Sequence, residues 1–192
     1  MNRFILFFFT CFILVNSSYA QQKDTERKGK VHWVSLQEAI ELQKIQPKPL
    51  MIDVYTKWCG PCRMMSQNTF ETDSVAIFLN QKYYAVKFDA EGNDSIVMHG
   101  QTFVNKDYVP NTPGRGAVHP LAMYLNVSAY PTLIFMDEQL NFLAPIVGYK
   151  TPSQIEIYLK LFGGNQYKSI VTTEQWQAYE KAFVPTWPDG TK

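Results

Sequence analysis

Residues 50–62 read LMIDVYTKWCGPC, and this stretch decides the fold. Its first half is a nearly continuous apolar run, broken by Asp53, which is typical of a strand buried on both faces of a parallel sheet. Its second half places Pro61 between two cysteines, where the first turn of a helix tolerates proline. The stretch therefore predicts a strand that delivers Cys59 and Cys62 to the N-terminus of a helix.

The two cysteines have a direct chemical use in this position. At a helix N-terminus, unpaired backbone N–H groups and the positive end of the helix dipole stabilise a Cys59 thiolate. Lowering the pKa of a thiol toward neutrality raises its reactive fraction at pH 7 from a few per cent to about half. Cys62 lies one turn further on and faces the same way, so it can attack a mixed disulfide formed on Cys59. We therefore expect Cys59 to attack and Cys62 to resolve.

Two alternatives remain for this cysteine pair, namely half of a zinc site or a purely structural disulfide. No second cysteine pair follows, and the three histidines lie at no recognised ligand spacing, so we expect no metal and no other cofactor. A disulfide that closes so small a loop would restrain the unfolded chain very little. Among the histidines, His119 is expected to cap a helix or to lie at the surface, with contact to the active face as the alternative.

The segments on either side of this stretch predict alternating strands and helices. Capping residues, prolines and glycines bound them, and the order strand, helix, strand implies a right-handed parallel crossover. Strands are expected at 31–34, 50–55, 83–88, 130–136 and, after a turn at 137–141, up to 147, and helices from 35 to the proline at 47, at 61–65, 74–81, 119–125, 151–162 and 173–183. Together they predict an α/β fold with a central mixed sheet flanked by helices.

One domain over residues 31–163 accounts for these elements. Residues 21–30 are polar and without periodicity, as in a flexible linker. Residues 164–192 are a C-terminal extension with one predicted helix. Its apolar face, which should dock on the domain, carries Trp176, Tyr179 and Phe183.

An insertion at about 91–118 interrupts the domain before the strand that begins near residue 130. Gly, Asn, Asp and Pro recur in it, which indicates a loop or hairpin, with short strands at 101–104 and 108–109. Because it leaves the carboxyl end of a parallel strand, it should emerge on the side of the cysteines. It could recognise a partner protein there or merely cover a sheet edge. The residues expected to contact such a partner are Phe103, Tyr108 and Val109.

The first 20 residues are typical of a secretory signal peptide. Arg3 precedes an uncharged run at 4–15, and a small-x-small pattern ends at Ala20. A retained membrane anchor is the alternative, but this run spans roughly 18 Å as a helix against a hydrocarbon core of roughly 30 Å. We therefore expect a periplasmic or secreted protein with no stable membrane insertion after cleavage.

The composition excludes several classes of protein. The 192 residues are 46% hydrophobic and carry 18 Lys and Arg against 17 Asp and Glu. Disordered chains, collagen-like repeats and basic nucleic-acid-binding domains each need a strong bias that these counts lack. We expect a globular protein with no nucleic-acid partner.

The residues around the cysteines resemble the thioredoxin family over about 31–163. The resemblance is carried by WCGPC at 58–62, by Asp53 upstream, by the later Tyr130-Pro131-Thr132, and by Gly148 after a hairpin. The stretch 48–53, with Thr69, Phe70 and Val75, also resembles the C-terminal periplasmic domain of DsbD-type reductant transporters.

This resemblance implies roles for individual residues. Pro131 should follow a cis peptide bond and pack against the cysteines, with the Tyr130 backbone offering hydrogen bonds to an extended substrate. Asp53 should be the buried carboxylate that accepts the Cys62 proton. The cation expected near Asp53 is Lys87, since side chains alternate along a strand, with Lys57 as the alternative. The remaining residues implied at the substrate surface are Trp58, Gly60, Pro61 and Gly148, and for Trp58 an ordinary core position is equally open.

The resemblance also implies an activity. Pro61 resembles the reducing members, so we expect a thiol–disulfide oxidoreductase that reduces protein disulfides and is recharged by a thiol electron donor. The alternative is a binding or chaperone-like module with little turnover that is dedicated to one exported partner.

Overall fold

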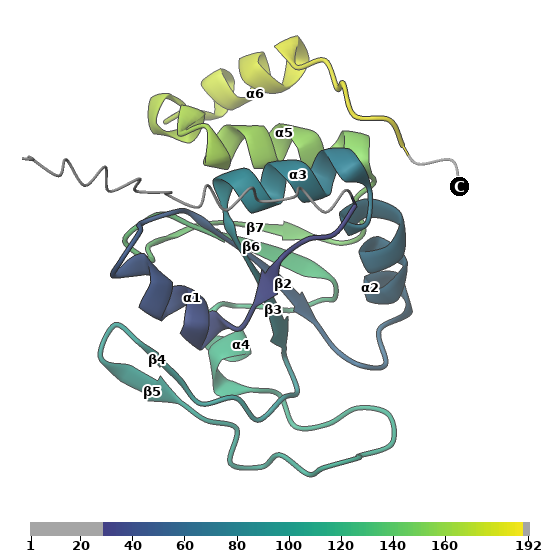
Figure 1. Cartoon of the computed structure of the whole chain (residues 1–192), viewed down its shortest axis with the longest axis vertical. Helices are drawn as coiled ribbons and strands as arrows, with labels where there is room; N and C mark the ends of the chain where they lie inside the picture. Colours follow the sequence, from purple (N-terminus) through teal and green to yellow (C-terminus); the bar gives the residue numbers. More distant parts are fainter. Residues whose placement is uncertain (1–28, 190–192) are drawn as a thin grey trace, which may run out of the picture.

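The computed structural model describes residues 29–189, so the predicted signal peptide at 1–20 and most of the predicted linker lie outside it. Five strands form a mixed sheet in the order β1-β3-β2-β6-β7 (Figure 1). β1, β3 and β2 are parallel, whereas β6 runs antiparallel to both β2 and β7. The strands are β1 (Trp33–Val34), β2 (Leu50–Tyr55), β3 (Tyr84–Asp89), β6 (Thr132–Met136) and β7 (Phe142–Val147). The predicted mixed sheet is confirmed.

Helices cover both faces of the sheet. Figure 1 shows α1 (Leu36–Gln43) and α4 (Pro120–Tyr124) on one side, with α3 (Asp73–Lys82), α5 (Pro152–Gly163) and α6 (Thr173–Ala182) stacked on the other. α2 (Gly60–Met65) continues into a π-helical turn, η1 (Ser66–Phe70), and a 3-10 turn, η2 (Gln166–Ser169), precedes α6. No helix within residues 29–189 has both the length and the apolar character needed to cross a bilayer.

Alternation along β2 divides its side chains between two apolar cores. Leu50, Ile52 and Val54 face the core under α1 and α4, whereas Met51 faces the core under α2, α3 and α5. Asp53 shares the Met51 face by the same alternation. The strand therefore points one carboxylate toward the side on which the cysteine-bearing helix packs.

The insertion contains a hairpin that was only half predicted. β4 (Ile96–Met98) and β5 (Gln101–Phe103) pair with each other and form a sheet of their own, apart from the main one. The predicted strand at 101–104 is confirmed, whereas the one at 108–109 is wrong, because those residues lie in the loop that follows. The tight turn at His99 and Gly100 has positive φ at both residues. Glycine is common in such turns, whereas a histidine at this position does not indicate one in the sequence.

The C-terminal extension folds back on the domain, as its apolar helix face predicts. Trp176 of α6 stacks on Tyr158 of α5 with ring centroids 6.0 Å apart. Beyond α6 the chain returns to α5, where the buried carboxylate of Glu156 accepts hydrogen bonds from the backbone N–H groups of Thr186 and Trp187. The Glu156 carboxylate thus helps to fix the tail to the domain, together with the Asp189 carboxylate, which accepts hydrogen bonds from Ser153.

Candidate active site

The cysteine pair lies where β2 leads into α2. Cys59 is the N-cap of α2, its Sγ accepts a hydrogen bond from the Cys62 N–H at 3.1 Å, and a disulfide joins the two residues. Pro61 lies in the first turn, as predicted. Only 2% of Cys59 and 5% of Cys62 is exposed, so a substrate has to reach the sulfur atoms across the surrounding rim.

A cis peptide bond between Tyr130 and Pro131 precedes β6, as the resemblance implies. The Pro131 carbonyl accepts a hydrogen bond from the Gly148 N–H at 2.8 Å. Gly148 has φ +85°, a left-handed conformation that favours glycine, and it directly follows β7. Gly148 therefore holds the end of β7 against the cis-proline loop, and its predicted contact with substrate stays a prediction.

Asp53 and Lys87 are partners in the parallel register of β2 and β3. Lys87 Nζ lies 2.5 Å from Asp53 Oδ2, with 1% of the Asp53 side chain and 27% of the Lys87 side chain exposed. The expected cation near Asp53 is thus Lys87, and the alternative is wrong, since Lys57 pairs with Asp89 at 3.7 Å. The Lys87 ammonium also lies over the rings of Trp33, Tyr55 and Phe70.

The pairing of Asp53 is incomplete. Its Oδ1 has no hydrogen-bond partner among residues 29–189, and neither does the buried Thr56 hydroxyl oxygen. Burial raises the pKa of Asp53 above its ordinary value, and the Lys87 charge offsets this only in part. A carboxyl group with a raised pKa can take up a proton nearer neutrality than an ordinary aspartate.

A hollow of about 370 Å³ connects this ion pair with the second cysteine. Its wall includes Cys62, Lys87 and Thr56, together with Arg63 and Ser66 of the cysteine-bearing helical segment. Because Lys87 is both in this wall and bonded to Asp53, the hollow connects Cys62 with the cation that pairs with the buried carboxylate. The arrangement suits proton exchange at Cys62, while the role of Asp53 in it stays a prediction.

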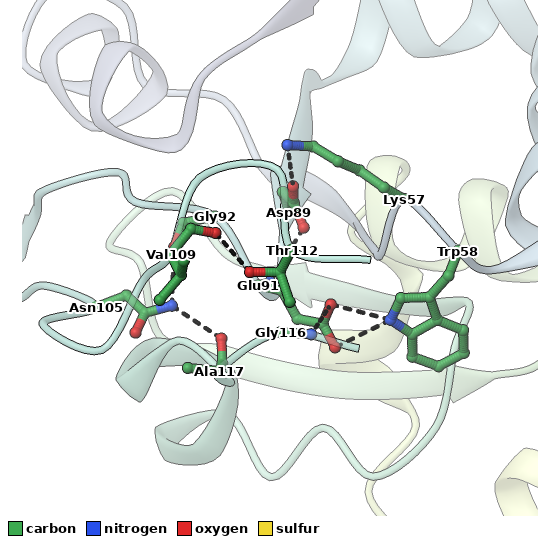
Figure 2. Close-up of polar contacts among 10 residues, drawn as sticks. All are labelled: Lys57, Trp58, Asp89, Glu91, Gly92, Asn105, Val109, Thr112, Gly116 and Ala117. Atoms are coloured by element: carbon green, nitrogen blue, oxygen red, sulfur yellow. Dashed lines mark hydrogen bonds and ion pairs between the residues drawn. The ribbon is translucent and has the colours of Figure 1, made fainter. Parts of the chain in front are cut away.

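Residues of the insertion contact the side chain of Trp58, the residue before Cys59 (Figure 2). The indole Nε1 donates to both carboxylate oxygens of Glu91, at 3.0 and 2.9 Å. The Arg115 guanidinium lies over the indole ring, 4.7 Å from its centroid, and the Tyr130 ring meets it edge-on at 5.8 Å. Trp58 is therefore half-buried between the insertion and the cis-proline loop, and it is not an ordinary core tryptophan.

The family model for a thioredoxin-like domain matches residues 36–163, two cysteines and cis-proline included. The chain belongs to the thioredoxin-like family. A cysteine pair close enough for a disulfide, in a thioredoxin-like domain, supports thiol–disulfide oxidoreductase chemistry in general.

Individual relatives resemble parts of this thioredoxin-like chain. A thioredoxin-like protein of Synechocystis sp. is 36% identical over 55 residues, which are 29% of this chain and 50% of that protein. The chain thus spans about half the length of this curated relative. A thioredoxin-fold protein from Helicobacter pylori superposes with a TM-score of 0.56 at 13% identity, over 81% of this chain and 91% of that one. A thioredoxin from Thermus thermophilus gives 0.51 at 15%, over 68% and 85%. At these identities the solved structures show the fold.

Two expectations about the insertion and its neighbours need correction. Phe103 is buried in the core against Tyr124 and cannot meet a partner, whereas Val109 is exposed on the loop. His119 caps α4 as expected, accepting from the Leu121 N–H through Nδ1, but it is fully buried and its Nε2 lies 2.9 Å from the Asp94 carbonyl oxygen. His119 therefore holds the start of the insertion and does not lie at the surface.

Sequence reasoning missed Glu91 and Arg115. Glu91 comes just after the carboxyl end of β3, the edge where active residues gather in such sheets, and this position was the one available signal. Arg115 stands between two glycines in a loop and offered no pattern at all. Within residues 29–189, no three His, Cys, Asp or Glu side chains gather in a way that could hold a metal ion.

Proposed function

We propose that this thioredoxin-like protein is an exported thiol–disulfide oxidoreductase that reduces protein disulfides. The observation that carries the proposal is the disulfide-linked pair at the start of α2, with Cys59 at the cap and Cys62 one turn on. A purely structural disulfide over so short a loop would contribute little to stability, so the pair is better explained by its chemistry.

The reaction proceeds through a mixed disulfide. The Cys59 thiolate attacks one sulfur of a substrate disulfide, which forms a Cys59–substrate disulfide and releases the other substrate sulfur as a thiolate. Cys62 then loses its proton and attacks the Cys59 sulfur, which releases the second substrate thiol and leaves the Cys59–Cys62 disulfide. The substrate has gained two electrons, and an external dithiol donor returns the pair to its reduced form.

The neighbouring residues have distinct parts in this scheme. The edge of the cis-proline loop at Tyr130 would pair with an extended substrate backbone, as in β-augmentation. Asp53, with its raised pKa, would accept the Cys62 proton during resolution, and Lys87 would hold that carboxylate in place. Trp58, Gly60 and Pro61 would form the surface against which the substrate lies.

A disulfide reduction assay on insulin, with dithiothreitol as the electron donor, tests the activity. We expect faster insulin reduction with the wild-type protein and the background rate with Cys59→Ser. A wild-type protein that never exceeds background would instead favour the binding-module alternative, in which the fold holds one partner without turnover. Export is tested separately by N-terminal sequencing of protein produced in cells with a secretory pathway, where we expect the chain to begin at Gln21.

A further inference from the structure

The part of the insertion after the hairpin is a closed loop that is attached, through Glu91, to Trp58 at the rim around the cysteines. The buried Asn105 side chain donates to the carbonyl oxygens of Gly92 and Ala117, at 3.0 and 2.9 Å, and so joins the two ends of the loop (Figure 2). The Gly116 N–H donates to Glu91 Oε2 at 2.9 Å. Arg115 is therefore presented from a loop whose base is held by hydrogen bonds next to the cysteines.

Arg115 is also oriented by its neighbours. Its guanidinium stacks over the Trp58 ring, whose edge is held by Glu91, and Trp58 directly precedes the buried Cys59. A guanidinium that stacks on an aromatic face keeps its planar N–H edge free for two hydrogen bonds to a carboxylate. The stacking reduces the freedom that the long arginine side chain would lose on binding a ligand.

The carboxylates beside the cysteines are held by other groups. Glu91 keeps its charge, but both of its oxygens accept hydrogen bonds from the indole and Oε2 also accepts one from the Gly116 N–H, whereas Asp89 faces Lys57 at 3.7 Å. Within residues 29–189, no carboxylate lies within 4.0 Å of the guanidinium of Arg115 or of the exposed Arg63, which donates to the Lys57 carbonyl oxygen at 3.1 Å. Two guanidinium groups without ion-pair partners thus lie near the path to Cys59.

We infer that Arg115 is a specificity-determining residue that selects disulfides in acidic segments of polypeptide. An Asp or Glu beside the target cysteine would bind the free edge of the guanidinium while the cysteine reaches Cys59 across the rim. The inference rests on the proposed function, since it names the substrate class of the same site. For an exposed pair of this kind we expect a preference of about three- to tenfold.

The test compares two disulfide-bonded peptides that differ only in the residues flanking one cysteine, Glu in one and Gln in the other. With dithiothreitol as donor, the ratio of their kcat/KM values is measured for the wild type, Arg115→Gln, Arg115→Lys and Lys106→Gln. Lys106 is an exposed cation of the same loop, away from Trp58, and serves as the matched control. Because each variant is compared with itself on two peptides, a general loss of activity cancels.

We expect the wild type and Lys106→Gln to favour the Glu peptide about three- to tenfold, Arg115→Gln to treat both peptides alike, and Arg115→Lys to fall between. The wild-type preference should also shrink when NaCl is raised to about 0.5 M. Equal turnover of both peptides by the wild type, or an undiminished preference in Arg115→Gln, would overturn the inference and leave the proposed function intact. If the wild type reduces neither of the two peptides nor hydroxyethyl disulfide, which is a small neutral disulfide, the proposed function fails and the inference with it.

Discussion

Replacement of Asp53 by Asn removes the buried negative charge and keeps the shape of the side chain. In the native protein the Asp53 charge is buried, and the cost of removing it from water outweighs the attraction of Lys87. An amide in its place has no charge to desolvate, which favours the folded variant. The loss of the ion pair works against this gain. That loss is small here because Lys87 borders a hollow of about 370 Å³ and can be hydrated there. Because a raised pKa means that the charged form is less stable in the folded protein than in the unfolded chain, we expect Asp53→Asn to raise the free energy of unfolding at pH 7 to 8 by about 1–3 kcal/mol.

The sign of the pH dependence follows from the raised pKa of Asp53. Between its ordinary and its raised pKa, the folded protein binds more protons at this site than the unfolded chain, so the stability that the site contributes falls as the pH rises. Asn does not titrate. The gain in the free energy of unfolding from Asp53→Asn should therefore be smallest near pH 4. It should grow as the pH rises from the ordinary to the raised pKa of Asp53 and level off above the raised pKa.

Urea unfolding of both proteins between pH 4 and pH 8, with the cysteines kept reduced, measures this difference. The matched control is Asp107→Asn, which removes an exposed carboxylate from the insertion loop and should change stability by less than about 0.5 kcal/mol at every pH. An Asp53→Asn protein that is less stable than the wild type at pH 8, or a gain that does not vary with pH, would show that the buried Asp53 charge does not destabilise the folded protein.

The same variant tests the chemistry of Asp53. Without a nearby proton acceptor, the attack of Cys62 on the mixed disulfide should slow by up to about 10²-fold at pH 6 to 7, and the deficit should shrink at high pH. Stopped-flow release of the second substrate thiol follows this step. An unchanged rate at pH 6 to 7 would leave Asp53 a buried structural acid.

The remaining predictions concern the tail, a buried hydroxyl and the cis-proline loop. Burial raises the pKa of Glu156, but hydrogen bonds from Lys160, Thr186 and the Trp187 N–H outweigh this effect and hold the pKa below its ordinary value. The stability that Glu156 contributes to the fold is therefore fully present above the ordinary glutamate pKa and is lost as the pH falls through the lowered pKa. Glu156→Ala should cost about 2–4 kcal/mol in urea unfolding at pH 7, and a smaller cost at pH 7 than at pH 3 would contradict this. Thr56→Val, which replaces an unpartnered hydroxyl by a methyl group, should leave stability unchanged or raise it by about 1 kcal/mol, and a loss above 1 kcal/mol would reveal a hydrogen bond to water. Gly148→Ala forces an L side chain to φ +85° and should cost about 1–2 kcal/mol while lowering kcat/KM for peptide disulfides, with unaltered stability as the contrary result.

The cysteine site could be predicted because its parts are local or follow from strand periodicity. The strand and the helix cap that place Cys59 lie within thirteen consecutive residues, 50–62. The pairing of Asp53 with Lys87 follows from alternation on two neighbouring parallel strands, whose register puts these residues side by side. The cis-proline came from the family resemblance, since the sequence by itself gives no such signal.

The rest could not be predicted because it depends on contacts between distant segments that share no pattern. The bond between Trp58 and Glu91 joins residues 33 positions apart, and that between Glu156 and Thr186 joins residues 30 apart. Phe103 is an aromatic residue of the kind that often contacts a partner protein, but the strand on which it lies points its side chain into the core. Which face a short hairpin presents is decided by a turn at His99 and Gly100, and histidine has little preference for that conformation.

In the proposed reaction Cys59 attacks a disulfide and Cys62 resolves it, and the Cys62→Ser variant separates these two steps. The reduced variant is mixed with a disulfide-bonded peptide and analysed by intact mass spectrometry, with proteolytic mapping of the modified residue and Cys59→Ser as the control. We predict a stable adduct of one peptide on Cys59 that dithiothreitol removes, and no adduct on Cys62 in the control. A Cys62→Ser protein whose Cys59 stays free, or a control that forms the adduct equally well on Cys62, would contradict the proposed order of attack.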